Sequence, residues 1–390
     1  MSTPIDGHCA PEFARVREAF EANFAERGEL GAAVHVIVAG ETVVDLVGGW
    51  RDEARTQPWR HDTIVDVYSV GKAILALLAL ALVEEGGLAL EQPVADVWPE
   101  FAAGGKAGAT VAHALSHRAG VPAIREALSD EDLLDWERMT GALAATEAWW
   151  VPGERVAYHT NTFGHLVGEL VHRASGQMPG DRLRAIAEPL GADVWFGVPV
   201  AEQHRCADVV WAPAQPMPAL GTFDGLEGDL LMNMLAHFNP PGYSSVGLVN
   251  TPAWRSSQIG STSGHASASG IARIYAALLE PGRLLSPELL AHATTARATG
   301  HCPILGEEVA FGLGFQPTTA RRPLGPNGRS FGHFGTGGAL GFADPDAGVA
   351  FGYAMNHVIP RWQSTLNRTL VDAVYSSLAA AGQISAENPG

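Results

Sequence analysis

The sequence predicts an α/β architecture of the α+β type. One antiparallel sheet is built from both ends of the chain, N- and C-terminal helices flank it, and an all-helical lobe is inserted between. Three observations predict this: strand patterns occur near both termini, the middle is mainly helical, and an amphipathic helix stands at each end. With 390 residues, of which 46% are hydrophobic and 17% charged, the chain can bury a large core without disulfide bonds.

The N-terminal part predicts a helix laid on a β-hairpin. Apolar residues recur at helical spacing over residues 11–27, so one face of this helix packs inward. Two β-rich runs follow at 32–39 and 42–47, and the Gly40-Glu41 pair between them favours a hairpin turn.

The middle of the chain is mainly helical. Residues 72–85 form a strongly apolar helix that Gly86 and Gly87 end. Pro-rich loops at 211–218 and 240–243 separate later helices. Further helical patterns occur at 128–148, 163–174, 226–238 and 264–279.

The C-terminal part returns to strands and closes with a helix. Strand patterns occur at 309–315, 329–334, 341–344 and 349–356, and a helical pattern at 363–381. We therefore expect one catalytic unit made of two lobes. Residues 1–68 and 265–390 form the α/β lobe, and residues 69–264 form the mainly helical lobe. A boundary between two such lobes is the default place for a site.

The charge and the cysteine content exclude several classes of function. Acidic residues outnumber basic ones by 42 to 25, a net charge of −17, and no basic patch offsets this, so nucleic acid is excluded as the default partner. Cys9, Cys206 and Cys302 are an odd number and lie far apart in the sequence. We therefore expect neither a metal site nor a disulfide framework.

An export signal has a basic region followed by an apolar region. The N-terminal residues of this sequence show neither. The longest apolar run, residues 73–83, has 11 residues, whereas about 20 are needed to span a bilayer. We therefore expect a cytoplasmic protein without a membrane partner; the sequence leaves a homo-oligomer possible.

The two lysines stand out among 23 arginines. We expect Lys106, inside a Gly-rich run, to lie in a surface turn, whereas Lys72 begins the long apolar helix. A partly buried amine can lose its proton, which a guanidinium cannot. Ser69 precedes Lys72 by three residues and shares its helix face, so the amine is placed to activate a hydroxyl nucleophile. The alternative is a Ser near a helix start and a Lys reaching the surface.

A strand-like run at 63–68 leads into this motif. The segment Tyr-Ser-Val-Gly-Lys at 68–72 resembles the Ser-x-x-Lys motif of the serine β-lactamase and penicillin-binding-protein superfamily. The chain looks most like its family VIII carboxylesterases, which are similar to class C β-lactamases. The segments at 92–94, 110–122 and 150–153 follow in the family's order. The resemblance implies the β-lactamase/DD-peptidase-like fold, catalysis through an acyl-enzyme on Ser69, and no metal or cofactor.

The family's second motif is a tyrosine that opens a helix, and Tyr158 matches it. By resemblance, Tyr158 and Lys72 shuttle the serine proton to the leaving group. The ordinary alternative is a tyrosine that caps a helix start. The β-lactamase form has Tyr-x-Asn, but here residue 160 is Thr and Asn161 comes one place late. The departure puts recognition of lactams or peptides in doubt, whereas an ester does not need that amide.

The Gly-rich segment 331–345 resembles the family's third motif, Lys-Thr-Gly or His-x-Gly. Glycines let a strand edge approach a substrate, and we assign an oxyanion-hole N–H to Thr336 together with that of Ser69. His333 and Gly335 are expected to contact the substrate, and Trp150 to line an apolar pocket. The alternative is a Gly-rich strand corner with a packed histidine.

Three other motifs fail. Residues 328–332 match G-x-S-x-G, but Ser330 runs into a strand pattern, whereas a nucleophile elbow needs a helix after it. His113 and His117 have no third metal ligand, so we expect them to be structural. Residues 335–341 do not open a helix, which argues against a dinucleotide site.

The sequence therefore predicts a carboxylesterase-type serine hydrolase for small or medium acyl esters. A β-lactamase, a D-amino peptidase, an amide hydrolase or an acyltransferase on the same fold stays open. The alternative from another class is a catalytically inactive binding module.

Overall fold

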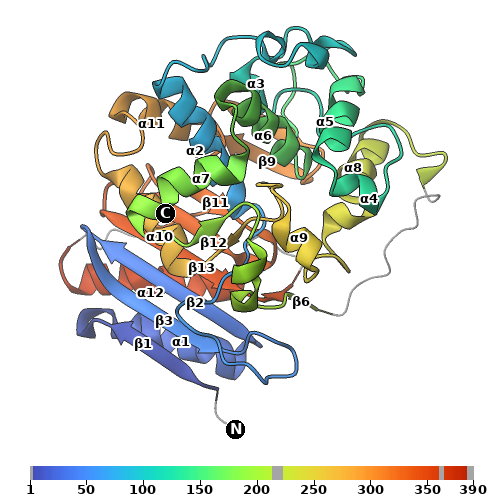
Figure 1. Cartoon of the computed structure of the whole chain (residues 1–390). Helices are drawn as coiled ribbons and strands as arrows, with labels where there is room; N and C mark the ends of the chain where they lie inside the picture. The colour runs from blue at the N-terminus through green and yellow to red at the C-terminus, as the bar shows by residue number, and fades with distance from the viewer. Residues whose placement is uncertain (1–2, 213–222, 360–363, 384–390) are drawn as a thin grey trace.

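The computed structural model describes residues 3–212, 223–359 and 364–383. Its centre is a seven-stranded antiparallel sheet to which both ends of the chain contribute strands (Figure 1). From one edge to the other the order is β1 (Ile5–Cys9), β3 (Glu41–Gly49), β2 (Gly31–Val38), β13 (Val349–Met355), β12 (Leu340–Asp344), β11 (Phe331–Phe334) and β10 (Gln316–Pro317). The predicted hairpin is the β2–β3 pair, and β13 joins the two ends of the chain by pairing with β2.

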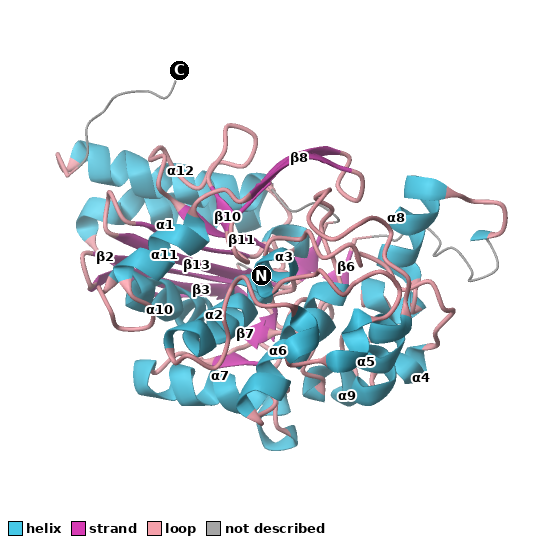
Figure 2. Ribbon diagram, turned by 90° about the horizontal axis from the view of Figure 1, so that it is seen from above, coloured by secondary structure: helices cyan, strands magenta, loops and turns pink. Residues whose placement is uncertain are grey.

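Helices cover both faces of this sheet. The terminal helices α1 (Ala14–Glu26) and α12 (Thr365–Ala380) flank the sheet, as predicted; both lie over the same face and pack on each other. Helix α10 (Ala268–Leu279) lies on the other face, against β2, β12 and β13 (Figure 2). The sheet is therefore buried on both sides, which explains why β13 is apolar along its whole length.

The helices between the two sets of strands gather to one side of the sheet (Figure 1). The pattern at 128–148 is two helices, because Asp135 caps a new helix start by accepting the N–H of Arg138. In the expected loop at 211–218, the residues from 213 on lie outside the described ranges. The helices of this part are α2 (Val70–Glu84), α3 (Val111–Leu115), α4 (Asp130–Leu133), α5 (Trp136–Ala145), α6 (Thr162–Ser175), α7 (Pro179–Ala187), α8 (Gly228–Phe238) and α9 (Pro252–Ser256), and α11 (Pro287–Thr294) follows α10.

Two strand predictions need correction. The pattern at 309–315 does not join the central sheet: β9 (Glu307–Phe311) pairs with β8 (Ala298–Cys302) in a separate hairpin. Strand β1 was not predicted, because its short polar sequence carries little apolar alternation. Three short strands, β4 (Val65–Asp66), β7 (His265–Ala266) and β5 (Val194–Trp195), form a small sheet beside the start of α2. A further pair is β6 (Val210–Trp211) with β14 (His357–Val358).

The Gly-rich run around Lys106 is a surface turn, as predicted, but the side chain of Lys106 itself points inward. Its side chain is fully buried, and Nζ donates to the carbonyl oxygens of Ala103, at 2.6 Å, and Thr146. The ammonium also lies over the ring of Phe101, 5.2 Å from its centroid. Because Ala103 belongs to the turn and Thr146 to the C-terminal end of α5, the amine ties the turn to this helix. Composition showed the turn but not the direction of the side chain.

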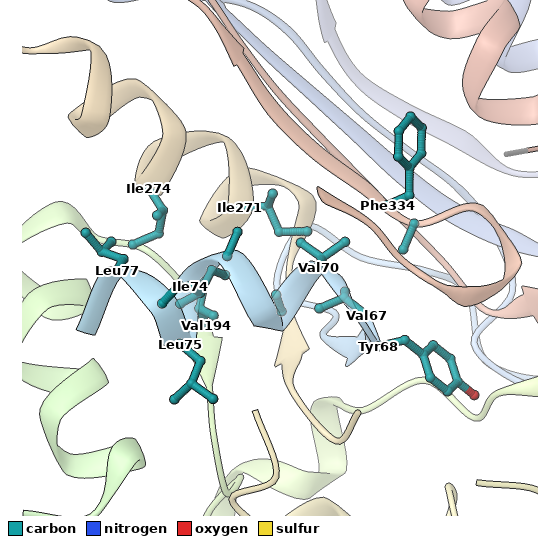
Figure 3. Close-up of a cluster of buried hydrophobic side chains, with 14 of the residues drawn as sticks. Val67, Tyr68, Val70, Ile74, Leu75, Leu77, Val194, Ile271, Ile274 and Phe334 are labelled. Carbon is teal, nitrogen blue, oxygen red and sulfur yellow. The ribbon is translucent and has the colours of Figure 1, made fainter. Parts of the chain in front are cut away.

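Helix α2 is the centre of the core. It is buried from Val70 to Leu82, so it packs on all sides rather than along one stripe. Figure 3 shows Val70 and Ile74 directed toward Ile271 and Ile274 of α10. Each such aliphatic side chain contributes roughly 1.5–3 kcal/mol when it is fully buried. The start of α2 is therefore held firmly in place. Within the described residues, no helix is long and apolar enough to cross a membrane.

Candidate active site

Ser69 and Lys72 meet at the start of α2. Lys72 Nζ lies 2.9 Å from Ser69 Oγ, and its other contact is the carbonyl oxygen of Ser261 at 3.0 Å. Ser69 is 9% exposed and Lys72 is fully buried. No ion pair to Lys72 occurs among residues 3–212, 223–359 and 364–383. Burial without a counter-charge lowers the pKa of Lys72 well below its usual 10.5, so the neutral amine is favoured.

Tyr158 completes a group of three polar side chains. Its hydroxyl lies close enough to Ser69 for that side chain to lower the pKa of the phenol, and Lys72 Nζ lies 4.8 Å from the centre of its ring. Burial raises the pKa of the phenol above its usual 10.0, although Ser69 and the more distant Arg322 cation both oppose this. Tyr158 is therefore a neutral phenol, which can both donate and accept a hydrogen bond, rather than a phenolate.

The ring of Tyr158 packs against three other ring-containing side chains. Phe311 of β9 stacks on it with centroids 5.6 Å apart and an interplanar angle of 14°. His333 of β11 lies 6.1 Å away and His117 4.8 Å away. The backbone N–H of Tyr158 donates to Cys302 Sγ on β8 at 3.2 Å. The β8–β9 hairpin, which lies outside the central sheet, therefore positions the tyrosine from two sides.

The site histidines are buried and neutral. Burial lowers the pKa of His333 to about 3 and that of His159 to about 4. The pKa of His117 falls well below 6.5, mainly through burial. His113 accepts the N–H of Thr110 in a capping box. His117 Nδ1 accepts the N–H of His159 at 3.1 Å, so both histidines are partners in local hydrogen bonds. Across the described ranges no three His, Cys, Asp or Glu residues are grouped to hold a metal.

The Gly-rich segment reaches the nucleophile through close backbone approach. A Cβ at Gly335 would lie 2.4 Å from the carbonyl oxygen of Val67, so a larger residue would push this strand end away from Ser69. Thr336 begins a short 3-10 helix (Thr336–Gly338), so its N–H has no partner within that helix. His333 is fully buried and its Nδ1 bonds the carbonyl of Phe334 at 2.8 Å.

Four further side chains named by the sequence analysis have different surroundings. Trp150 is 9% exposed and belongs to the same apolar cluster as Tyr158. The Asn161 amide is buried: Nδ2 donates to the carbonyl of Ala236 on α8 at 2.8 Å, so it does not face a substrate. Thr160 Oγ1 has no hydrogen-bond partner in the described structure. Ser330 is buried directly before β11, with no helix after it, which confirms that its G-x-S-x-G match is accidental.

Sequence reasoning missed three groups that hold these residues in place. Ser261 supplies the carbonyl that accepts from Lys72, and Cys302 accepts from the Tyr158 backbone. Neither residue carries a signal in the sequence, since both contacts join segments more than a hundred residues apart. Asp66, the third, had one: it is a carboxyl group inside the apolar run that precedes Ser69, and it is 1% exposed.

The fold and the site together define a class: a β-lactamase-like fold in which an amine and a phenol flank a serine hydroxyl. Comparisons agree with this class. The beta-lactamase family matches residues 16–375. Esterase/beta-lactamase LipL of Mycobacterium tuberculosis is 33% identical over 373 residues, which cover 91% of this chain and 83% of LipL.

Two solved structures share the fold closely. A family VIII carboxylesterase superposes with a TM-score of 0.88 at 35% identity, over 96% of this chain and 100% of that chain. A penicillin-binding-protein homologue from Caulobacter crescentus gives a TM-score of 0.87 at 39% identity, over 96% and 100%. This chain belongs to the beta-lactamase family. The predicted superfamily and fold class are confirmed, and the class of enzyme is a serine hydrolase of the β-lactamase fold.

The buried histidines predict that acid destabilises the fold. The pKa values of His159 and His265 fall to about 4, and those of His165 and His333 to about 3, below the ordinary 6.5 of the unfolded chain. Below pH 6.5 the unfolded state therefore binds more protons at these sites, and the free energy of unfolding falls as the pH falls.

Two buried carboxyls oppose this trend. Burial raises the pKa of Glu29 to about 7 and of Asp66 to about 8, so the folded state holds extra protons there. Below pH 6 the four histidines outweigh these two groups, and we expect a net loss of roughly 2 kcal/mol per pH unit. Urea unfolding at pH 6 and pH 5 measures it. A protein equally stable or more stable at pH 5 would contradict the prediction.

Proposed function

We propose that the protein is a carboxylesterase-type serine hydrolase that cleaves small or medium acyl esters through an acyl-enzyme on Ser69. One observation carries the proposal: a fully buried amine without a counter-charge lies 2.9 Å from the hydroxyl of Ser69. A hydroxyl needs an adjacent base to act as a nucleophile, and the neutral amine is such a base. Relatives named as esterases agree with the choice.

The nucleophile and the groups that transfer protons in the proposed reaction are all side chains of this protein. Ser69 Oγ attacks the ester carbonyl carbon while its proton moves to Lys72 Nζ. Tyr158 gives its proton to the leaving alkoxide oxygen as the C–O bond breaks, and it takes up the proton that Lys72 received from Ser69, so that the phenol and the amine are both neutral again. Water then attacks the acyl-enzyme by the reverse path and releases the carboxylic acid. Proton transfer by such positioned groups contributes about 10²–10⁴-fold to a rate.

The oxyanion of the tetrahedral intermediate is assigned to two backbone N–H groups, those of Ser69 and Thr336. Ser69 directly precedes α2, whose N-terminus favours developing negative charge. Thr336 is the first residue of a short 3-10 helix, and the preceding Gly335 allows this helix to lie close to the Ser69 turn. His333, Gly335 and Trp150 are proposed to shape the substrate side of the site, His333 by packing on Tyr158.

The hydrogen bonding of Asn161 favours an ester substrate over a lactam or peptide. Its amide is committed to the carbonyl of Ala236, and Thr160 stands where the β-lactamase motif has asparagine. The chain therefore offers no asparagine side chain at this position to bind the amide group of a lactam or peptide. An ester substrate has no such group. The apolar cluster around Tyr158 and Trp150 suits an uncharged acyl or alcohol group.

The test of this function compares two substrates and locates the adduct. We expect turnover of a p-nitrophenyl ester of a short or medium acid to exceed that of a chromogenic cephalosporin. A fluorophosphonate is expected to add one equivalent, mapped by peptide mass to Ser69 and not to Ser330. Faster cephalosporin turnover would assign a β-lactamase, and preferential transfer to added alcohol an acyltransferase. Absence of any adduct would indicate an inactive binding module.

Replacement of Lys72 by arginine separates the charge from the removable proton. Lys72→Arg keeps the positive charge but abolishes the base, so we expect kcat to fall by about 10²–10⁴. Lys106→Arg is the matched control, because Lys106 is the other buried lysine and lies outside the site. Steady-state kinetics on the p-nitrophenyl ester measures both variants. Near-normal turnover by Lys72→Arg would show that Lys72 is only structural.

A further inference from the structure

The residue that precedes the nucleophile has an unusual backbone conformation. Tyr68 has φ +50°, in the left-handed region that bulky residues rarely adopt. Its side chain is buried, and Figure 3 shows the ring directed away from the apolar side chains of α2. The hydroxyl pairs with Ser245 Oγ at 3.1 Å, and Trp211 packs edge-on against the ring. A conformation of this kind persists only where surrounding contacts hold it.

A buried carboxyl group, that of Asp66, makes the backbone contact that holds this turn. Asp66 Oδ1 accepts the N–H of Tyr68 at 2.8 Å, and Oδ2 accepts the indole N–H of Trp254 at 2.7 Å. Asp66 is 1% exposed and Trp254 is fully buried. The two donors approach from different parts of the chain, since Trp254 lies 188 residues away on α9.

The segment that begins with Trp254 also reaches the other site residues. Ser261 accepts from Lys72 Nζ at 3.0 Å through its carbonyl, and its Oγ donates to the carbonyl of Asn161 at 2.7 Å. Asn161 lies three residues after Tyr158. A Cβ at Gly71 would lie 2.2 Å from the carbonyl oxygen of Gly260, so the segment also packs directly on the first turn of α2. The segment thus touches the surroundings of all three polar side chains.

We infer that Asp66 is a positioning residue for the reaction. It joins the turn that orients Ser69 to the segment that carries the Lys72 acceptor, and so sets the distance between nucleophile and base. This inference rests on the proposed function, because it assigns Asp66 a part in the same acyl transfer. Asp66 acts through Tyr68 and Trp254.

Both oxygens of the Asp66 carboxyl group act as hydrogen-bond acceptors, and a protonated oxygen can still accept through its lone pairs. Each carboxyl oxygen of Asp66 receives one N–H, whereas asparagine offers a single acceptor oxygen and an NH₂ donor. Asp66→Asn would keep the size of the side chain but bring its NH₂ against one of the two N–H groups. The turn or the 254–263 segment must then shift, and a shift of about 1 Å at a reacting group costs up to about 10²-fold in rate.

Asp66→Asn is compared with Glu29→Gln, a matched change at another buried carboxyl. Glu29 is 5% exposed and bonds the hydroxyl of Tyr353 on β13, away from the Ser69 turn. We expect Asp66→Asn to lower kcat for a p-nitrophenyl ester by about 10- to 100-fold, with KM within about twofold. Phosphonylation of Ser69 slows by the same factor. Glu29→Gln keeps kcat within about twofold, whatever its stability.

Trp254→Phe tests the same contact without altering Asp66. It removes the indole N–H together with part of the buried ring system, and we expect a fall in kcat of about threefold or more, again with KM unchanged. Added to Asp66→Asn it also removes the opposed donor, so the double variant is expected to recover part of the lost rate. If Asp66→Asn does not fold, Trp254→Phe alone decides.

Three results would overturn the inference: wild-type kcat in Asp66→Asn or Trp254→Phe, an equal loss in Glu29→Gln, or a large change in KM with kcat intact. Failure of the proposed function has a different signature, because the wild-type protein would then acquire no phosphonyl group at Ser69. The two failures are therefore distinguishable in one set of measurements.

Discussion

The short contact between the Lys72 amine and the Ser69 hydroxyl is the constraint on which the rest of the structure depends. An amine in water is charged at neutral pH and cannot accept the serine proton. Burial of the whole side chain without a counter-charge makes the neutral form favourable, and helix α2 provides that burial because it is apolar on every side. The i, i+3 spacing then brings the hydroxyl to the same face.

The other parts of the fold keep this contact in one geometry. The β8–β9 hairpin holds Tyr158 by stacking through Phe311 and by the sulfur of Cys302. The end of β11 comes close to the Ser69 turn only because position 335 is glycine. The segment from Trp254 to Ser263 joins the Ser69 turn to the acceptor of Lys72. Each contact joins distant parts of the chain, so the site forms only in the complete fold.

The sequence predicted what is local and missed what is not. Ser69 and Lys72 were found because helical spacing relates them directly, and the hairpin, α10 and α12 because their periodicity is strong. The burial of Lys106 was missed, since a Gly-rich run shows a turn but not which way a side chain points. Strand β8, the hairpin partner of β9, was missed because its sequence, ATGHC, carries little apolar alternation. The contact of Asp66 with Trp254 was missed for another reason. Pairing across the chain leaves no pattern in a single sequence.

The protonation state of Lys72 is the central claim, and the composition of the chain makes it measurable. With only two lysines, ¹⁵N-lysine labelling gives two side-chain amine signals, and Lys72→Arg identifies the one from Lys72 by its loss. An NMR titration then follows that signal with pH. The account predicts that Lys72 loses its proton well below pH 10.5 and is largely neutral in the range where the enzyme turns over esters. A Lys72 signal that stays charged up to about pH 10 would contradict it.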